Sequence, residues 1–133
     1  MKSIKEIFRI GNGPSSSHTM GPRAATIEFL RRCPADAVSF SVTLYGSLAA
    51  TGKGHLTDAA IISEFERRGH KVEIVWKPDV FLPYHPNAMT LTGLTADGRK
   101  ALEMTVYSVG GGAIKIEAVS YTHLRAHETR SNL

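Results

Sequence analysis

Hydrophobic and polar residues alternate most regularly in residues 38–44, where every second side chain is apolar. A period of two predicts a strand with one face on the core and the other toward solvent. Four later segments are also rich in β-branched and apolar residues and are separated by Pro, Gly and Asp turns: residues 71–76, 88–95, 101–109 and 112–119. The sequence therefore predicts five strands.

Helical spacing of apolar residues marks three other segments: residues 3–9, a segment from Thr19 or Pro22 to Arg32, and residues 57–68. Ser3 and Glu6 fit a capping box at the start of the first, and Thr57 is expected to cap the third. Together with the strands, these helices predict an α+β fold, in which a single domain of residues 1–118 packs helices on a mixed sheet.

The last stretch, residues 119–133, has no apolar periodicity and no helix cap. It resembles the translated read-through of a sequencing adapter, so we expect it to be a non-native tail that packs on nothing. His123 and His127 within it are spaced like metal ligands, but a chance spacing explains them better, and we assign them no role.

Composition narrows the functional classes. The chain of 133 residues is 42% hydrophobic and 21% charged, which is ordinary for a globular protein. Its net charge of +4 is scattered and lacks interleaved aromatic residues, so nucleic-acid binding is not expected. No segment is apolar enough for a membrane span or a signal peptide, so we expect a cytoplasmic protein without membrane contact. Cys33 is the only cysteine and cannot by itself supply the thiolates of an iron-sulfur site.

The stretch "GNGPSSSHTMGPRAA", residues 11–25, concentrates hydroxyl groups directly before a predicted helix. The hydroxyls of Ser15, Ser16, Ser17 and Thr19, beside free N–H groups at a helix start, suit a carboxylate or a phosphate. The alternative is a simple hydroxyl cap on a Gly-Pro turn, which leaves the other hydroxyls and His18 without a role. A serine-hydrolase interpretation fails because the chain has no G-x-S-x-G elbow.

Three further segments carry candidate chemistry. "GSLAATGKGHLTD" is a Gly-rich loop that presents Lys53 and His55, and its spacing does not match a phosphate-binding P-loop. His55 is able to accept a proton near neutral pH, although an exposed loop histidine is the simpler interpretation of that residue alone. "HPNAM" contains His85 and Asn87, and "YSVGGGAI" contains Gly110 and Gly111 at a turn where backbone must approach something closely or move. His70 and Cys33 are given structural roles at helix ends.

Taken together and in this order, "IGNGPSSSHTMGPRAA", "LYGSLAATGKGHLTD", "HPNAM" and "YSVGGG" resemble the beta chain, or N-terminal domain, of the bacterial iron-sulfur-dependent L-serine dehydratases. The resemblance covers Ser3 to about Ala118. It implies a fold similar to the allosteric substrate-binding domain of some phosphoglycerate dehydrogenases. It also implies conversion of L-serine to pyruvate and ammonia, with a [4Fe-4S] cluster whose ligands lie on a second domain or alpha chain.

The resemblance also implies roles for individual residues. His55 is the candidate base, and the substrate pocket includes Ser15, Ser16, Ser17, His18, Thr19, Lys53, His85, Asn87, Gly110 and Gly111. We expect this chain to be a fragment that is inactive alone, that binds no metal itself and that joins a homo- or hetero-oligomer. The competing hypothesis is a non-catalytic regulatory domain that binds a small carboxylate, which would need anion donors but no general base.

Overall fold

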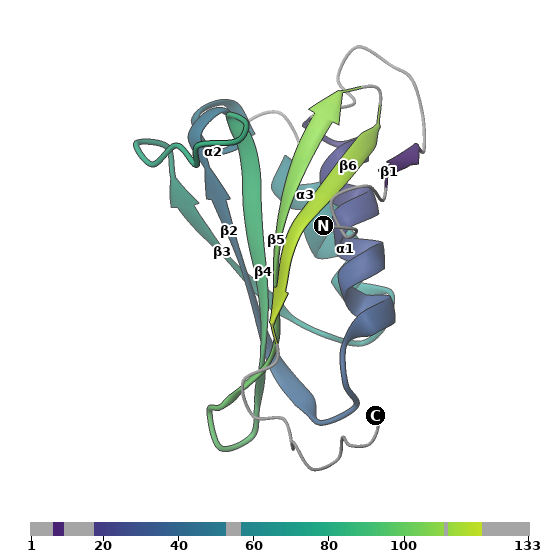
Figure 1. Ribbon diagram of the computed structural model, residues 1–133. Helices are drawn as coiled ribbons and strands as arrows, with labels where there is room; N and C mark the ends of the chain where they lie inside the picture. Colours follow the sequence, from purple (N-terminus) through teal and green to yellow (C-terminus); the bar gives the residue numbers. More distant parts are fainter. Residues whose placement is uncertain (1–6, 10–17, 53–56, 111, 121–133) are drawn as a thin grey trace.

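The computed structural model describes residues 7–9, 18–52, 57–110 and 112–120. Within them the elements are β1 (Ile7–Arg9), α1 (Met20–Arg32), β2 (Ala37–Tyr45), α2 (Gly46–Gly52), α3 (Thr57–Glu66), β3 (Val72–Lys77), β4 (Asn87–Thr95), β5 (Lys100–Gly110) and β6 (Ala113–Ser120). The strands form one sheet in the order β1-β6-β5-β4-β2-β3 (Figure 1). The predicted α+β fold with a mixed sheet is confirmed.

Among the described strands, one neighbouring pair is parallel. β2 and β3 run in the same direction, with α2 and α3 forming the connection between them, and the other neighbours are antiparallel. A parallel pair needs a long crossover, whereas β4, β5 and β6 follow one another through short turns. β3 ends the sheet on one side, because among the described residues it pairs with β2 alone.

Two helices cover one face of this sheet. α1 lies against β4, β5 and β6, and α3 lies beside α1 and against β3 (Figure 1). The alternation predicted for residues 38–44 is present from Phe40 onward, since Phe40, Val42 and Leu44 are buried in the core beneath the helices. Val38, expected on the same face, is instead 59% exposed, because the register of β2 against β4 shifts between Ala37 and Ser39. Phe29 of α1 and Phe65 of α3 meet Phe40 with ring centroids 5.3–6.4 Å apart. This aromatic cluster fixes the helices to the sheet.

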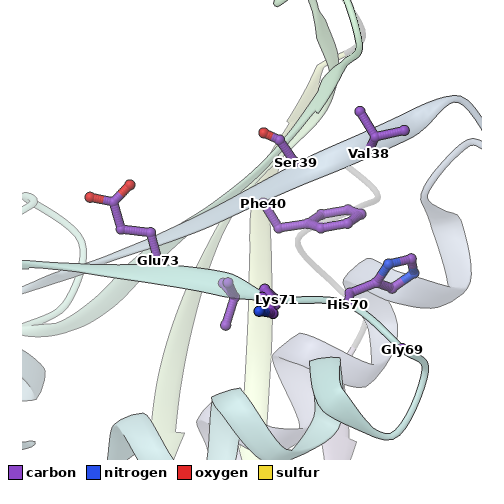
Figure 2. A pocket seen from close by; sticks show the side chains of 8 residues that line it. Val38, Ser39, Phe40, Gly69, His70, Lys71 and Glu73 are labelled. Carbon is purple, nitrogen blue, oxygen red and sulfur yellow. The ribbon is translucent and has the colours of Figure 1, made fainter.

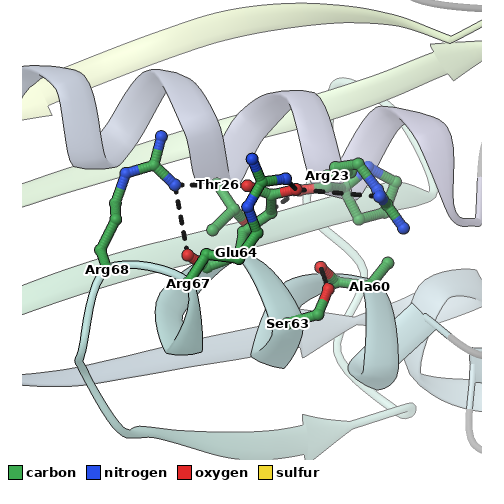
Figure 3. Close-up of polar contacts among 8 residues, drawn as sticks. Arg23, Thr26, Ala60, Ser63, Glu64, Arg67 and Arg68 are labelled. Atoms are coloured by element: carbon green, nitrogen blue, oxygen red, sulfur yellow. Dashed lines mark hydrogen bonds and ion pairs between the residues drawn. The ribbon is translucent and has the colours of Figure 1, made fainter.

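Two buried carboxylates organise the arginines of the helix layer. Glu64 of α3, whose side chain is 2% exposed, lies 3.7 Å from Arg23 of α1, 3.5 Å from Arg67 and 3.2 Å from Arg68 (Figure 3). Glu28 of α1 accepts hydrogen bonds from Arg31 and Arg32. A buried carboxylate needs such partners, because an unpaired charge in the protein interior is costly.

The first predicted helix is wrong where the structure describes it. Ile7–Arg9 is a strand that pairs antiparallel with the start of β6, with Phe8 opposite Ile114. The helical spacing and capping pattern are overridden by the pairing of Ile7–Arg9 with an available sheet edge, which a local sequence pattern cannot report.

Two other expectations need correction. Gly46–Gly52, expected to be part of a Gly-rich loop, is the short helix α2. The boundary at Ala118 falls inside β6, because Val119 and Ser120 pair with Met104 and Glu103 of β5 and Val119 packs against the core. The first two residues of the expected tail therefore belong to the sheet, and residues 121–133 lie outside the described part of the chain.

The remaining elements agree with the predictions. The helix ending at Arg32 and the strands predicted from residues 38, 71, 88, 101 and 112 are present, each within about two residues of its expected bounds. Among the described residues, no helix has both the length and the apolar character needed to span a bilayer.

Candidate functional site

The predicted site segments converge on one end of the sheet. β2 ends there at Tyr45, β4 begins there, and the turn from β5 to β6 lies at the same end, as the alternating directions of these strands require. α1 also begins at this end (Figure 1). Four described segments, far apart in the sequence, are thus brought to one end of the sheet.

The start of α1 is joined to the start of α3. The hydroxyl of Thr57, the first residue of α3, donates a hydrogen bond to the backbone carbonyl oxygen of His18. We expected Thr57 to cap its own helix, and its hydroxyl instead links two segments 39 positions apart. His18 and Thr19 are both half-buried, directly before Met20. The hydrogen bond from Thr57 of α3 therefore fixes the position of His18, two residues before α1 begins.

A second contact joins the end of β2 to the segment that contains His85 and Asn87. Gly46 and Asn87 form an antiparallel bridge, and the N–H of Ser47 donates to the carbonyl oxygen of Pro86 at 3.1 Å. Gly46 has a φ of +50°, and a Cβ atom there would lie 2.8 Å from both Pro86 O and the Phe81 ring. Only glycine fits this close approach without displacement.

His85 and Asn87 have defined orientations. The backbone N–H of Asn87 donates to Nδ1 of His85 at 3.0 Å, so the neutral imidazole carries its proton on Nε2. His85 in this form is a hydrogen-bond donor at Nε2 and is not available as a base at Nδ1. The side-chain oxygen of Asn87 is buried and has no hydrogen-bond partner among the described residues. An orphaned amide oxygen is suited to accept from a ligand's ammonium or hydroxyl group.

The turn between β5 and β6 uses glycine for its backbone conformation. Gly110 has a φ of +100° and Gly112 a φ of +77°, a region that other residues rarely adopt. A Cβ atom on Gly110 would meet no described atom within 4 Å. The turn therefore requires glycine for its φ angle, and close backbone approach is not what the described residues show at Gly110.

Several predicted site residues lie outside the described part of the chain: Ser15, Ser16, Ser17, Lys53, His55 and Gly111. Of the predicted set, the structure describes His18, Thr19, His85, Asn87 and Gly110, all of them at the same end of the sheet. The roles assigned to both groups of residues stay predictions.

An open groove of about 610 Å³ lies at the opposite end of the sheet (Figure 2). Val38, Phe40, His70 and Glu73 are among its lining residues. The His70 ring packs on Phe40 with centroids 4.7 Å apart, in agreement with a structural role for His70. Size alone does not make this groove the active site, because none of the predicted site residues that the structure describes lines it.

The described residues do not fit an iron-sulfur cluster. Among them, no group of three or more His, Cys, Asp or Glu side chains is arranged to hold a metal ion. Cys33 follows the last residue of α1 at the end remote from His18, and burial raises the pKa of its thiol to about 11. One cysteine cannot supply the several thiolates that hold an iron-sulfur cluster. Cys33 instead packs against the core near Gly93.

Comparison with known proteins finds a family match that covers most of the chain. The family model for the serine dehydratase beta chain matches residues 3–70 and 63–119. The chain belongs to this family. Together the two matched segments contain every predicted site residue.

Curated relatives include an L-serine dehydratase of Streptomyces coelicolor. It is 35% identical over an alignment 150 residues long, which covers 84% of this chain and 33% of the relative. The L-serine dehydratase of Mycobacterium bovis is 37% identical over 155 residues, covering 89% of this chain and 34% of the relative. L-serine dehydratase TdcG of Escherichia coli is 35% identical over 153 residues, covering 86% and 33%. This serine dehydratase beta domain therefore spans about a third of the length of these relatives.

Two contributors to the site were missed at the level of sequence. The link from Thr57 to His18 depends on the packing of α1 beside α3, and no local pattern signals it. The bridge from Gly46 to Asn87 has a weak signal, since a glycine directly after a predicted strand is typical of a tight turn. Neither residue type identifies its distant partner.

Proposed function

We propose that this chain forms the substrate-binding domain of an L-serine dehydratase, in which it holds the carboxylate and amino groups of L-serine at the end of the sheet where α1 begins. The observation that carries this proposal is the convergence of His18, at the end of the hydroxyl-rich motif, with the His85–Asn87 segment on one edge of the fold. The names of the relatives support L-serine as the substrate.

Each segment has a proposed role. The hydroxyls of Ser15, Ser16, Ser17 and Thr19 would bind the substrate carboxylate, beside the N–H groups at the start of α1. Lys53 would add positive charge near the carboxylate, and Gly110 and Gly111 would give room for the substrate backbone. These contacts suit a group that is negatively charged throughout the reaction.

His85 and Asn87 supply complementary groups. The Nε2–H of His85 is a donor for a substrate oxygen, and the buried Oδ1 of Asn87 is an acceptor for the substrate ammonium. Since one group donates and the other accepts, the pair distinguishes the two ends of an amino acid. L-serine would therefore be held in one orientation.

The reaction removes the α-proton and the hydroxyl of L-serine as water, giving aminoacrylate, which is hydrolysed to pyruvate and ammonia. His55 is the proposed base for the α-proton, because imidazole accepts protons near neutral pH. The [4Fe-4S] cluster implied by the family resemblance would need ligands from a second domain or alpha chain, because the described residues of this chain do not offer them.

A binding experiment on the 133-residue chain tests the proposal. Titration with L-serine, followed by ¹H–¹⁵N correlation spectra, should shift the amides of His18, Thr19 and Asn87. Asn87→Ala should weaken binding by about tenfold, because a buried acceptor for the ammonium is lost. His70→Ala, at the opposite end of the sheet, is the matched control and should leave binding unchanged.

Four outcomes separate the alternatives. Shifts confined to the His18 and Asn87 end support the proposal, and shifts centred on the groove around Phe40 and His70 contradict it. Binding at the proposed end, combined with full turnover by a His55→Ala variant in the assembled enzyme, would favour a regulatory carboxylate-binding domain. No shift with up to about 100 mM L-serine would overturn the proposal for this chain.

A further inference from the structure

The outer edge of β3 carries an unusual order of charges. Glu73 and Lys77 are exposed and lie four residues apart on the same face of the strand, away from the helices. Lys71 and Asp79 are also exposed and lie just beyond the two ends of β3. Among the described residues, none of these four side chains has an ion-pair partner. The signs along the edge therefore read plus, minus, plus, minus.

The same edge is open for hydrogen bonding. β3 pairs with β2 along its whole length, from Val72 opposite Phe40 to Lys77 opposite Tyr45. Its other side has no strand neighbour within the part of the chain that the structure describes. Half of its backbone N–H and C=O groups consequently face outward, and such an edge pairs readily with another strand unless something prevents it.

We propose that two copies of this chain associate through their β3 edges, antiparallel and with Val75 of one copy opposite Val75 of the other. In this register Glu73 of each copy faces Lys77 of its partner, which gives two opposite-charge cross-strand pairs. On the other face, Ile74 faces Trp76, so two apolar pairs meet beside the core. Lys71 of each copy approaches Asp79 of its partner at the two ends.

The charge pattern selects this register over the neighbouring ones. A shift that centres the pair on Ile74 places Lys71 opposite Lys77, and a shift that centres it on Trp76 places Glu73 opposite Asp79. Like charges directly opposite each other are destabilising, so both shifts are disfavoured. Scattered charges on an edge normally prevent pairing, whereas this order of charges permits one alignment and opposes the others.

The apolar residues of β3 agree with a covered edge. Val72, Ile74 and Trp76 pack against the core on their inner sides, yet all three remain half-buried instead of buried. The symmetry axis through Val75 would be perpendicular to the sheet, so the helices of both copies lie on the same face. The two sheets would then form one continuous sheet, with the exposed edges of Ile74 and Trp76 covered by the partner.

Charge reversal tests the interface, which does not depend on the proposed function. Sedimentation equilibrium of the full chain should show a concentration-dependent dimer that weakens at high salt. Glu73→Lys and Lys77→Glu should each weaken dimerisation by roughly tenfold or more, because each turns two attractive pairs into repulsive ones. The double variant Glu73→Lys/Lys77→Glu should restore it. Glu66→Lys, an exposed change of the same charge on α3, is the control and should have no effect.

A cross-linking experiment tests the symmetry directly. Val75→Cys places two thiols at directly opposed positions, where the Cα separation of about 4.5–5.5 Å permits a disulfide. Mild oxidation should therefore give a covalent dimer, which Glu66→Cys should not. A chain that stays monomeric up to about 1 mM, or a dimer that neither single charge reversal weakens, would overturn the proposal.

Discussion

The carboxylate of Glu28 in the helix layer makes the stability of the fold depend on pH. Burial alone would raise the pKa of Glu28, but the hydrogen bonds and positive charges of Arg31 and Arg32 outweigh it and hold that pKa below the ordinary value of 4.5. Between the lower pKa of the folded state and the ordinary value of 4.5, Glu28 therefore binds fewer protons in the folded state than in the unfolded state. The stabilisation is present above pH 4.5 and is lost as the pH falls through the lower, folded-state pKa.

We predict that Glu28→Gln lowers the free energy of unfolding by about 1–2 kcal/mol at pH 7, because it removes a charge that two arginines share. The difference between the variant and the wild type should shrink as the pH falls below 4.5. Urea unfolding at pH 7, 5, 4 and 3 measures this. Glu66→Gln, exposed on α3, is the control and should be neutral. A difference that stays constant to pH 3 would rule out the ionised Glu28 as its source.

Gly46 gives a second prediction at this scale. Gly46→Ala should lower the free energy of unfolding by about 2–4 kcal/mol, because the added Cβ meets both a positive φ and contacts of 2.8 Å with Pro86 and Phe81. Gly98→Ala separates the two causes, since Gly98 has a φ of +87° but open space around its Cα. It should cost only about 1 kcal/mol. Equal losses in the two variants would contradict the steric part of this explanation.

At the scale of elements, the hydrogen bond from Thr57 to His18 couples the start of α3 to the start of α1. Thr57→Ala should lower stability by about 1–2 kcal/mol and weaken L-serine binding several-fold, although Thr57 itself contacts no substrate in our proposal. Thr57→Ser keeps the hydroxyl and should restore most of both quantities. Calorimetry and thermal unfolding of the two variants measure the effects. If Ala and Ser bind L-serine equally, the coupling is absent.

Elements with strong periodicity could be predicted from the sequence. The alternation in residues 38–44 predicts β2 because half of those side chains enter the core, and α1 follows from its helical spacing for the same reason. β1 could not be predicted, since three residues carry too little pattern and the strand exists through its pairing with β6. α2 was not predicted, because the glycines at its two ends are typical of a loop.

The candidate site was predictable only as separate pieces. Each motif supplied residue types suited to a carboxylate or a proton, and the described members do lie at one end of the sheet. Their contacts depend on how the elements pack. Thr57 donates a hydrogen bond to His18, 39 positions away, and Gly46 forms a bridge with Asn87 where β2 and β4 lie side by side. Long-range partners of this kind leave no periodic signal in a sequence.

For the whole molecule, we predict that the chain alone forms no stable [4Fe-4S] cluster. Cys33 is its single thiol, and burial raises the pKa of that thiol to about 11. Anaerobic reconstitution with iron and sulfide should therefore leave no stoichiometric absorbance near 400 nm, and L-serine should give no pyruvate. Cys33→Ala should behave identically. A stoichiometric cluster on the wild-type chain that the Cys33→Ala variant loses would contradict this.

In the assembled enzyme, His55→Ala should lower kcat by about 10²- to 10⁴-fold, as expected for loss of a general base. Ser16→Ala should act mainly on KM, because its hydroxyl would bind a carboxylate that is present in both the ground state and the transition state. His70→Ala, whose ring packs on Phe40, is the control and should leave both constants near normal. A His55→Ala enzyme with nearly normal kcat would remove His55 from the mechanism.

The short strand β1 has a consequence for the binding of a ligand at the start of α1. Because Arg9 is paired with Ala113 and α1 begins at Met20, the described fold holds the chain on both sides of the hydroxyl-rich motif. A doubly tethered segment has fewer conformations to lose on binding than a segment attached at one end, so less of the binding free energy offsets lost chain entropy. Affinity for L-serine should therefore depend on the pairing of β1 with β6, even though β1 has no contact with the amino acid in our proposal.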